Sequence, residues 1–178
     1  ATHRRKAVTR WQQGDINIVV NCEPEGFAHS YDVVHGASVC ALGLRVDNVA
    51  AALARAERLE ITRFMQAVGP EEMQIPSVKG IGGSLIYFIE EGAQGKVWEH
   101  EFTHPLTTDS PRRPVGLQRV DHIAQTMQYE EFLSGLLYYV ALFDVTKTPQ
   151  IEIADTLGLI QSQAVESQDR SLRVTLNG

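Results

Sequence analysis

A strand, a helix and then further strands follow one another twice along the sequence, and this repeat limits the possible folds more than any other feature. In the first copy, residues 38–46 have the pattern of a strand, and Asp47 is placed to cap an amphipathic helix. Strands are expected next at 73–75 and 84–89, on either side of the turn-forming residues 80–83. This order predicts an α+β fold of repeated β-α-β-β-β modules.

The second copy begins about 80 residues after the first. It opens with a predicted strand at 120–127 and continues with a helix that has Phe132 and Leu136 on its apolar face. When the two helix starts are aligned, His122 falls opposite Ala41, so only the second copy has a candidate metal ligand at this position. The later strands of this copy are expected near Glu152, at 157–165 and at 172–177.

The repeat divides the chain into three regions. Residues 1–106 hold the end of a first module and one complete module, 107–116 have the composition of a linker, and 117–178 form the first module of a second half. Within the first region, 15–20 alternate as in a half-buried strand, and a loop is expected at 23–30. Because the sequence has no initiator methionine and the last module lacks a partner, we expect the chain to be part of a longer protein.

Composition excludes several classes of protein. With 43% hydrophobic and 21% charged residues the chain is globular, and a net charge of −6 argues against a nucleic-acid partner. No apolar run is long enough to span a membrane and no signal peptide is recognisable, so a cytoplasmic protein is expected. Cys22 and Cys40 lack the spacing of metal ligands and are expected to be reduced thiols.

Two motifs resemble functional sites and are interpreted as structural. His100-Glu101-Phe102-Thr103-His104 matches the H-E-x-x-H pattern of zinc peptidases, which requires a helix to bring both histidines to one face. Pro105 disfavours helical backbone at His104, so no zinc site is expected. The glycine-rich residues 79–84 lack the Gly-Lys-Ser/Thr ending of a phosphate loop and are interpreted as a tight turn.

The second copy holds the candidate site residues. On its first strand, His122 shares one face with small neighbours, as a metal ligand or as a structural, hydrogen-bonded histidine. If the last two strands turn at 166–170, Ser162 pairs with Thr175, and Ser162 and Asn177 become diagonal neighbours about 7 Å apart on one face. A hydroxyl and an amide would then face the same space, although a solvent-facing polar stripe would have the same pattern.

Several runs of the sequence resemble 4-hydroxyphenylpyruvate dioxygenase, a member of the vicinal oxygen chelate superfamily, which is built from β-α-β-β-β modules. They are QGDINIVVN at 13–21, HGASVCA at 35–41, IPSVKGIGGSLIY at 75–87 and VDH at 120–122. Within this family, EPEGFAHSY at 23–31 and DHIAQ at 121–125 are most similar to a bacterial variant. In that variant a dioxygenase-like half follows a sugar-phosphate-isomerase-like barrel that acts as a 3-dehydroshikimate dehydratase.

The resemblance implies a role for each candidate residue. His122 matches the first histidine of a two-histidine, one-carboxylate Fe(II) site, and Ser162 and Asn177 match side chains that line the substrate pocket. Thr175 stands where the family has proline. Because the other ligands would belong to the absent module, we expect Fe(II) or another divalent metal only in the complete protein and an inactive chain in isolation.

Two functions follow from the resemblance. The first is the dioxygenase-like, metal-binding region of a 3-dehydroshikimate dehydratase, which serves aromatic catabolism and yields protocatechuate. The second is an Fe(II)-dependent 4-hydroxyphenylpyruvate dioxygenase, which decarboxylates a 2-oxo acid and hydroxylates its ring. Either protein would act on a small molecule, 3-dehydroshikimate or a 2-oxo acid, and is expected to be a homo-oligomer.

Overall fold

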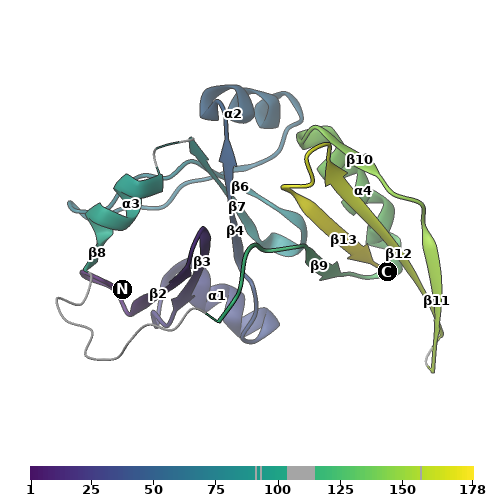
Figure 1. Cartoon of the computed structure of the whole chain (residues 1–178), viewed down its shortest axis with the longest axis horizontal. Coiled ribbons are helices and arrows are strands. Elements are labelled where there is room, and N and C mark those ends of the chain that lie inside the picture. Colours follow the sequence, from purple (N-terminus) through teal and green to yellow (C-terminus); the bar gives the residue numbers. More distant parts are fainter. Residues whose placement is uncertain (91, 93, 104–114, 157) are drawn as a thin grey trace. The chain divides into compact units, whose positions relative to one another are not determined.

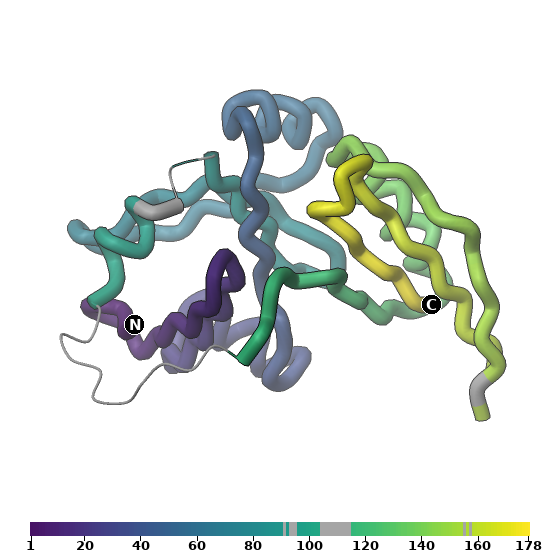
Figure 2. Tube along the Cα trace, in the orientation of Figure 1, coloured from purple at the N-terminus to yellow at the C-terminus, as the bar shows by residue number. Residues whose placement is uncertain are grey.

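The chain forms two compact units, residues 1–119 and 120–178. The structure is a computed structural model that describes residues 1–90, 92, 94–103, 115–156 and 158–178, and Figure 2 follows the backbone by colour from the N-terminus to the C-terminus. The linker expected at 107–116 lies largely outside the described residues, so the predicted domain limits stay predictions. Among the described helices, none has the length and apolar character that crossing a membrane requires.

The second unit is one β-α-β-β-β module (Figure 1). Its sheet has the order β10-β12-β13-β9, and β10 and β11 pair with successive parts of β12, so they act as two segments of one strand. The first strand, β9, runs parallel to the last, β13, whereas β12 and β13 are antiparallel. The elements are β9 (Ile123–Thr126), α4 (Tyr129–Leu142), β10 (Val145–Lys147), β11 (Ile151–Asp155), β12 (Gly158–Ser167) and β13 (Arg173–Asn177).

The first unit contains a module of the same topology. Its sheet has the order β4-β7-β6-β5, with the first strand β4 parallel to the last strand β7. The repeated β-α-β-β-β fold predicted from the sequence is therefore confirmed. The elements are β4 (Ala41–Val46), α2 (Val49–Arg58), β5 (Arg63–Phe64), β6 (Ser77–Lys79), the 3₁₀ turn η1 (Ile81–Gly83) and β7 (Leu85–Glu90).

A second sheet in the first unit has the order β3-β2-β1-β8. Helix α3 leads directly into β8, which pairs with β1 at the other end of the unit's sequence. The elements are β1 (Thr2–His3), β2 (Val8–Gln13), β3 (Ile16–Asn21), α1 (Gly26–His35), α3 (Gln94–Glu101) and β8 (Phe102–Thr103).

Two predictions for the N-terminal residues are wrong. The loop expected at 23–30 is largely helix α1, and every residue of that helix is at least partly exposed. The sequence of α1 therefore lacks the wide apolar stripe by which a helix is predicted. The helix contacts the rest of the unit through the ring of Phe27, whose centroid lies 5.2 Å from that of the Phe64 ring. The strand expected at 15–20 does form, but Ile18 and Val20 on β3 are exposed, so it is not half-buried.

The first complete module differs from expectation in two details. Residues 73–75 form no strand, and the second and third strands are β5 and β6. The N-cap of α2 is Asn48, whose side chain accepts a hydrogen bond from the Ala51 N–H at 2.8 Å, and not Asp47. Because α2 begins one residue later than predicted, aligning the starts of α2 and α4 places His122 opposite Leu42 instead of Ala41. Neither residue can bind a metal, so the first module has no candidate ligand at the position of His122.

A polar network joins the N-terminal strand to the segment before β6. His3 is buried, with Nε2 at 3.3 Å from Glu101 Oε2 and 3.9 Å from Glu72 Oε1. Its Nδ1 accepts the backbone N–H groups of Arg5 and Lys6 at 3.1 and 3.0 Å. Burial by itself would raise the pKa of Glu72, but hydrogen bonds from the Gly69 N–H and the Lys6 ammonium together lower it.

The core of the second unit lies between α4 and the sheet. Phe132, Leu136 and Tyr139 are buried on α4, which lies against β12 and β13. The Tyr139 hydroxyl donates a hydrogen bond to Gln125 Oε1 at 2.6 Å, so the polar tip of this buried side chain is satisfied by the first strand. The helix therefore covers one face of the sheet and leaves the other face to the candidate site residues.

Replacing Asn48 tests the assigned cap. Asn48→Ala is expected to lower the free energy of unfolding by about 1 kcal/mol, because it removes the acceptor for the Ala51 N–H. Asp47→Ala is the control and should cost only a few tenths of a kcal/mol, through the helix dipole alone. Chemical denaturation followed by circular dichroism measures both, and a larger loss for Asp47→Ala would contradict the assignment.

Alkaline titration tests the burial of Tyr139, which raises its pKa to about 12, against about 10 in an unfolded chain. Because the pKa is higher in the folded protein, the neutral phenol stabilises the fold fully below about pH 10, and this contribution is lost as the pH rises from about 10 to 12. We expect the unfolding temperature to fall across that window. Tyr139→Phe should reduce the late rise in tyrosinate absorbance, and the exposed Tyr129→Phe should leave it unchanged.

Candidate functional site

His122 lies immediately before β9, because the strand predicted at 120–127 is shorter and covers only Ile123–Thr126. The side chain is 49% exposed, and its Nδ1 stands 2.7 Å from Asp121 Oδ2. A carboxylate accepts here, so Nδ1–H donates to Asp121, and Nε2 is the ring nitrogen that remains for another partner. Alternation along a strand would have put Asp121 and His122 on opposite faces, and the two meet because neither belongs to the strand.

Ser162 and Asn177 face each other directly across β12 and β13. Gln161 and Gly178 exchange both backbone hydrogen bonds, at 2.9 and 2.8 Å. The next pair, Ser162 and Asn177, is therefore a non-hydrogen-bonded pair, the type in which side chains come closest. The predicted pairing of Ser162 with Thr175 is wrong, since Thr175 lies opposite Ala164. An error of two residues preserves the face, so the hydroxyl and the amide still share one side of the sheet.

The shared face is the one opposite α4. Val174 and Leu176 are fully buried toward the helix, so Thr175 and Asn177, which alternate with them on β13, point to the other side. On this side Ser162 is only 6% exposed, and Asn177 is half-buried. On β9, Thr126 pairs with Asn177 in the parallel register, so Thr126 lies on the same face of the sheet.

Metal ligands are too few in the described part of the chain to form a centre. No group of three His, Cys, Asp or Glu side chains in that part could hold an ion. His122 has only Asp121 beside it, and one imidazole with an adjacent carboxylate does not make a two-histidine, one-carboxylate site. The described residues therefore fit a single ligand of such a site and not the whole.

The H-E-x-x-H motif does not form a zinc site in the described residues. Helix α3 contains His100 and Glu101 but ends there, and Phe102 and Thr103 are already strand β8. The two residues between the end of α3 and His104 are therefore extended, which removes the helical spacing that the motif requires. His104 and Pro105 themselves lie outside the described residues.

The comparison with protein families shows which family this chain belongs to. The family described as hydroxyphenylpyruvate dioxygenase, N-terminal, matches residues 1–103. The chain belongs to this family. The resemblance inferred from the sequence is thereby confirmed, and the site residues on the second unit lie beyond the matched range.

Relatives of the hydroxyphenylpyruvate dioxygenase family extend the match to the whole chain. The 3-dehydroshikimate dehydratase of Pseudomonas putida is 39% identical over 176 residues, which is 98% of this chain and 27% of that protein. The 4-hydroxyphenylpyruvate dioxygenase of a Pseudomonas species is 31% identical over 180 residues, 99% of this chain and 50% of that protein. The chain thus spans 27% of the length of the dehydratase.

A solved structure has a similar fold. It is described as a xylose isomerase-like TIM barrel/4-hydroxyphenylpyruvate dioxygenase fusion protein, and it matches with a TM-score of 0.80 and 36% identity over 98% of this chain and 27% of that one. A 4-hydroxymandelate synthase variant from Streptomyces coelicolor, 17% identical with a TM-score of 0.69, shares the fold. The expected dioxygenase-type fold is confirmed by both.

A pair of cysteines tests the observed register. In a background with Cys22→Ser and Cys40→Ser, Ser162→Cys with Asn177→Cys should form a disulfide on oxidation, because directly opposed Cβ atoms lie about 5 Å apart. Ser162→Cys with Thr175→Cys is the control, and as a diagonal pair it should stay reduced. Non-reducing electrophoresis with peptide mass mapping reads the result, and preferential cross-linking of the control pair would refute the register.

Proposed function

We propose that the chain is the dioxygenase-like, metal-binding region of a 3-dehydroshikimate dehydratase. One observation carries this proposal: the match covers 98% of the chain but the same 27% share of both a dehydratase and a barrel–dioxygenase fusion. Dehydration of 3-dehydroshikimate to protocatechuate would then belong to a barrel in another part of the protein. The complete protein is proposed to be a cytoplasmic homo-oligomer with small-molecule ligands only.

Within this region, His122 is proposed as one ligand of a divalent metal, Fe(II) or another ion, whose other ligands lie outside this chain. The contact with Asp121 supports the role, because a carboxylate on Nδ1 orients the ring and leaves Nε2 as the nitrogen that a metal would take. Ser162 and Asn177 are proposed to orient a ligand on the same face. Their direct opposition and partial burial support a built polar surface in preference to a solvent-facing stripe.

The alternative is an Fe(II)-dependent 4-hydroxyphenylpyruvate dioxygenase. The observation that favours it is the 31% identity to such an enzyme over 99% of this chain, a span that covers half of the enzyme. Such a protein would take a 2-oxo acid as substrate and would consume O₂.

His122→Ala in the full-length protein separates the two functions. For the dehydratase, release of protocatechuate from 3-dehydroshikimate should continue at the wild-type rate, whereas the divalent metal bound per protein should fall by about one equivalent, because one lost ligand of a facial site weakens binding severely. Metal analysis, O₂ uptake with 4-hydroxyphenylpyruvate and protocatechuate absorbance are the measurements. His29→Ala, which replaces an exposed histidine of α1, is the control.

O₂ uptake that needs His122, without release of protocatechuate, would establish the dioxygenase instead. If the wild-type protein binds no more divalent metal than His122→Ala, the metal-binding role is refuted. The region would then be a structural part of the dehydratase.

A further inference from the structure

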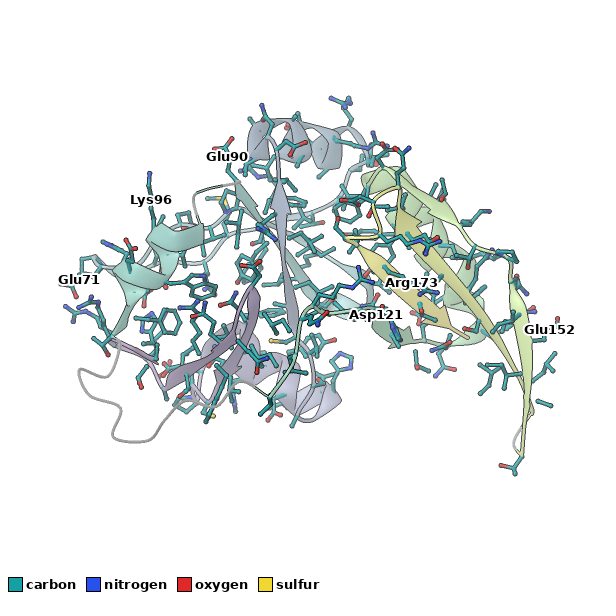
Figure 3. All side chains as sticks on the ribbon, viewed as in Figure 1. Glu71, Glu90, Lys96, Asp121, Glu152 and Arg173 are labelled. Atoms are coloured by element: carbon teal, nitrogen blue, oxygen red, sulfur yellow. The ribbon has the colours of Figure 1, made fainter. Side chains whose placement is uncertain are left out.

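Arg10 is a buried arginine in the middle of β2, in the first unit. It is only 5% exposed, whereas the next residue, Trp11, is 66% exposed, so the two side chains lie on the covered and the open face of the sheet. Trp98 of α3 lies over the covered face, with its ring centre 4.3 Å from the guanidinium carbon of Arg10. Lys96, two residues earlier on α3, projects from the opposite side of that helix, away from the sheet (Figure 3).

The guanidinium of Arg10 is positioned from two sides. Its Nε donates a hydrogen bond to Asn17 Oδ1 at 2.8 Å, across the hairpin on β3. The amide of Asn17 is itself fixed, because its Nδ2 donates to the backbone oxygen of Asp15 at 2.9 Å. The indole of Trp98 lies against the guanidinium as in a cation–π contact. The orientation of the guanidinium is therefore set by the fold.

The two terminal nitrogens of Arg10 are unused. Among the described residues, Nη1 and Nη2 have no hydrogen-bond partner, and no Asp or Glu forms an ion pair with them. In the same part of the chain, the side-chain nitrogen that is fully buried and lacks a partner is Nε of Arg173. Nη1 and Nη2 of Arg10 also lack a partner, so neither of them is fully buried. Both can be reached from solvent.

A largely buried charge without a counter-charge is unfavourable. Burial lowers the pKa of Arg10, which shows that the charged form is disfavoured here, yet a guanidinium stays protonated at physiological pH. An anion at the accessible end would offset this cost. Because Nε is occupied by Asn17, the two terminal nitrogens form the end of a planar fork, and this end matches the two oxygens of a carboxylate.

The surroundings of Arg10 favour an anion with a single charge and an apolar body. Six residues of β2 and β3 share the covered face: Val8, Arg10, Gln12, Asn17, Val19 and Asn21. Arg10 is the charged residue among these six, so one carboxylate balances it, whereas a phosphate dianion would leave a charge without a partner. Val19 lies directly opposite Arg10 and is 45% exposed, which leaves apolar surface beside the guanidinium.

We propose that Arg10 and Trp98 form a binding site for a small monocarboxylate with an apolar body, within the first unit. Nη1 and Nη2 of Arg10 bind the two carboxylate oxygens, and Asn17 is a positioning residue that holds the guanidinium. The apolar part of the ligand lies against the exposed side of Val19 and the indole of Trp98. This inference goes beyond the proposed function and needs neither the metal nor the dehydration.

Titration of the full-length protein, followed by fluorine NMR, tests the proposal. The probe is 4-fluorobenzoate, and 4-fluorobenzamide is its uncharged analogue. Arg10→Gln should raise the Kd for 4-fluorobenzoate by roughly tenfold to hundredfold, because it removes a charged contact to both oxygens, and it should leave the amide unaffected. Arg4→Gln is the matched control, because Arg4 is exposed and donates to the backbone oxygens of His100 and Glu99. It should change no Kd more than about twofold.

Several outcomes would overturn the assignment of Arg10. They are no saturable binding of 4-fluorobenzoate, a Kd that Arg10→Gln leaves unchanged, and an equal loss of the acid and the amide. Binding that Asn177→Ala weakens and Arg10→Gln does not would place the acid on the second unit, which overturns this inference and leaves the proposed function standing.

Competition and a charge-preserving variant complete the test. Displacement of 4-fluorobenzoate by acetate supports a carboxylate site, and tighter competition by inorganic phosphate refutes the preference for a single charge. Arg10→Lys keeps the charge without the fork and guards against misfolding of Arg10→Gln. With an unchanged unfolding temperature, an intermediate Kd for Arg10→Lys supports the contact to both oxygens, and a wild-type Kd refutes it.

Discussion

Parallel pairing of the first and last strands is the constraint on which each module depends. β4 pairs in parallel with β7, and β9 with β13, although a helix and further strands separate them in the sequence. Two parallel neighbours begin at the same edge of a sheet, so the residue before β9 lies beside the first residue of β13. This is why His122 and Arg173, far apart in the chain, occupy one level of one sheet.

The alternation of side chains explains which predictions survived. The sequence-based pairing of Ser162 was wrong by two residues, yet its main conclusion held, because the period of a strand is two and an even error returns each side chain to its own face. The modules were equally predictable, since the apolar stripe with Phe132 and Leu136 has the spacing of a helix that covers a sheet. The place of Ser162 and Asn177 on one face could be inferred from periodicity alone.

Features that depend on geometry outside the local pattern could not be predicted. Helix α1 buries no full stripe and is positioned by the Phe27–Phe64 ring contact, which joins segments distant in sequence. The contact of Asp121 with His122 arises because the strand starts at Ile123, three residues later than the pattern indicates. Cap choice between adjacent Asp47 and Asn48 is set by backbone angles that composition does not encode.

The buried imidazole of His3 can carry its proton in only one place. Backbone N–H groups can only donate, and two of them point at Nδ1, so this nitrogen must accept and the hydrogen must reside on Nε2, toward Glu101. The ring is thereby held as a single tautomer that serves two segments at once, a turn on one side and a helix end on the other.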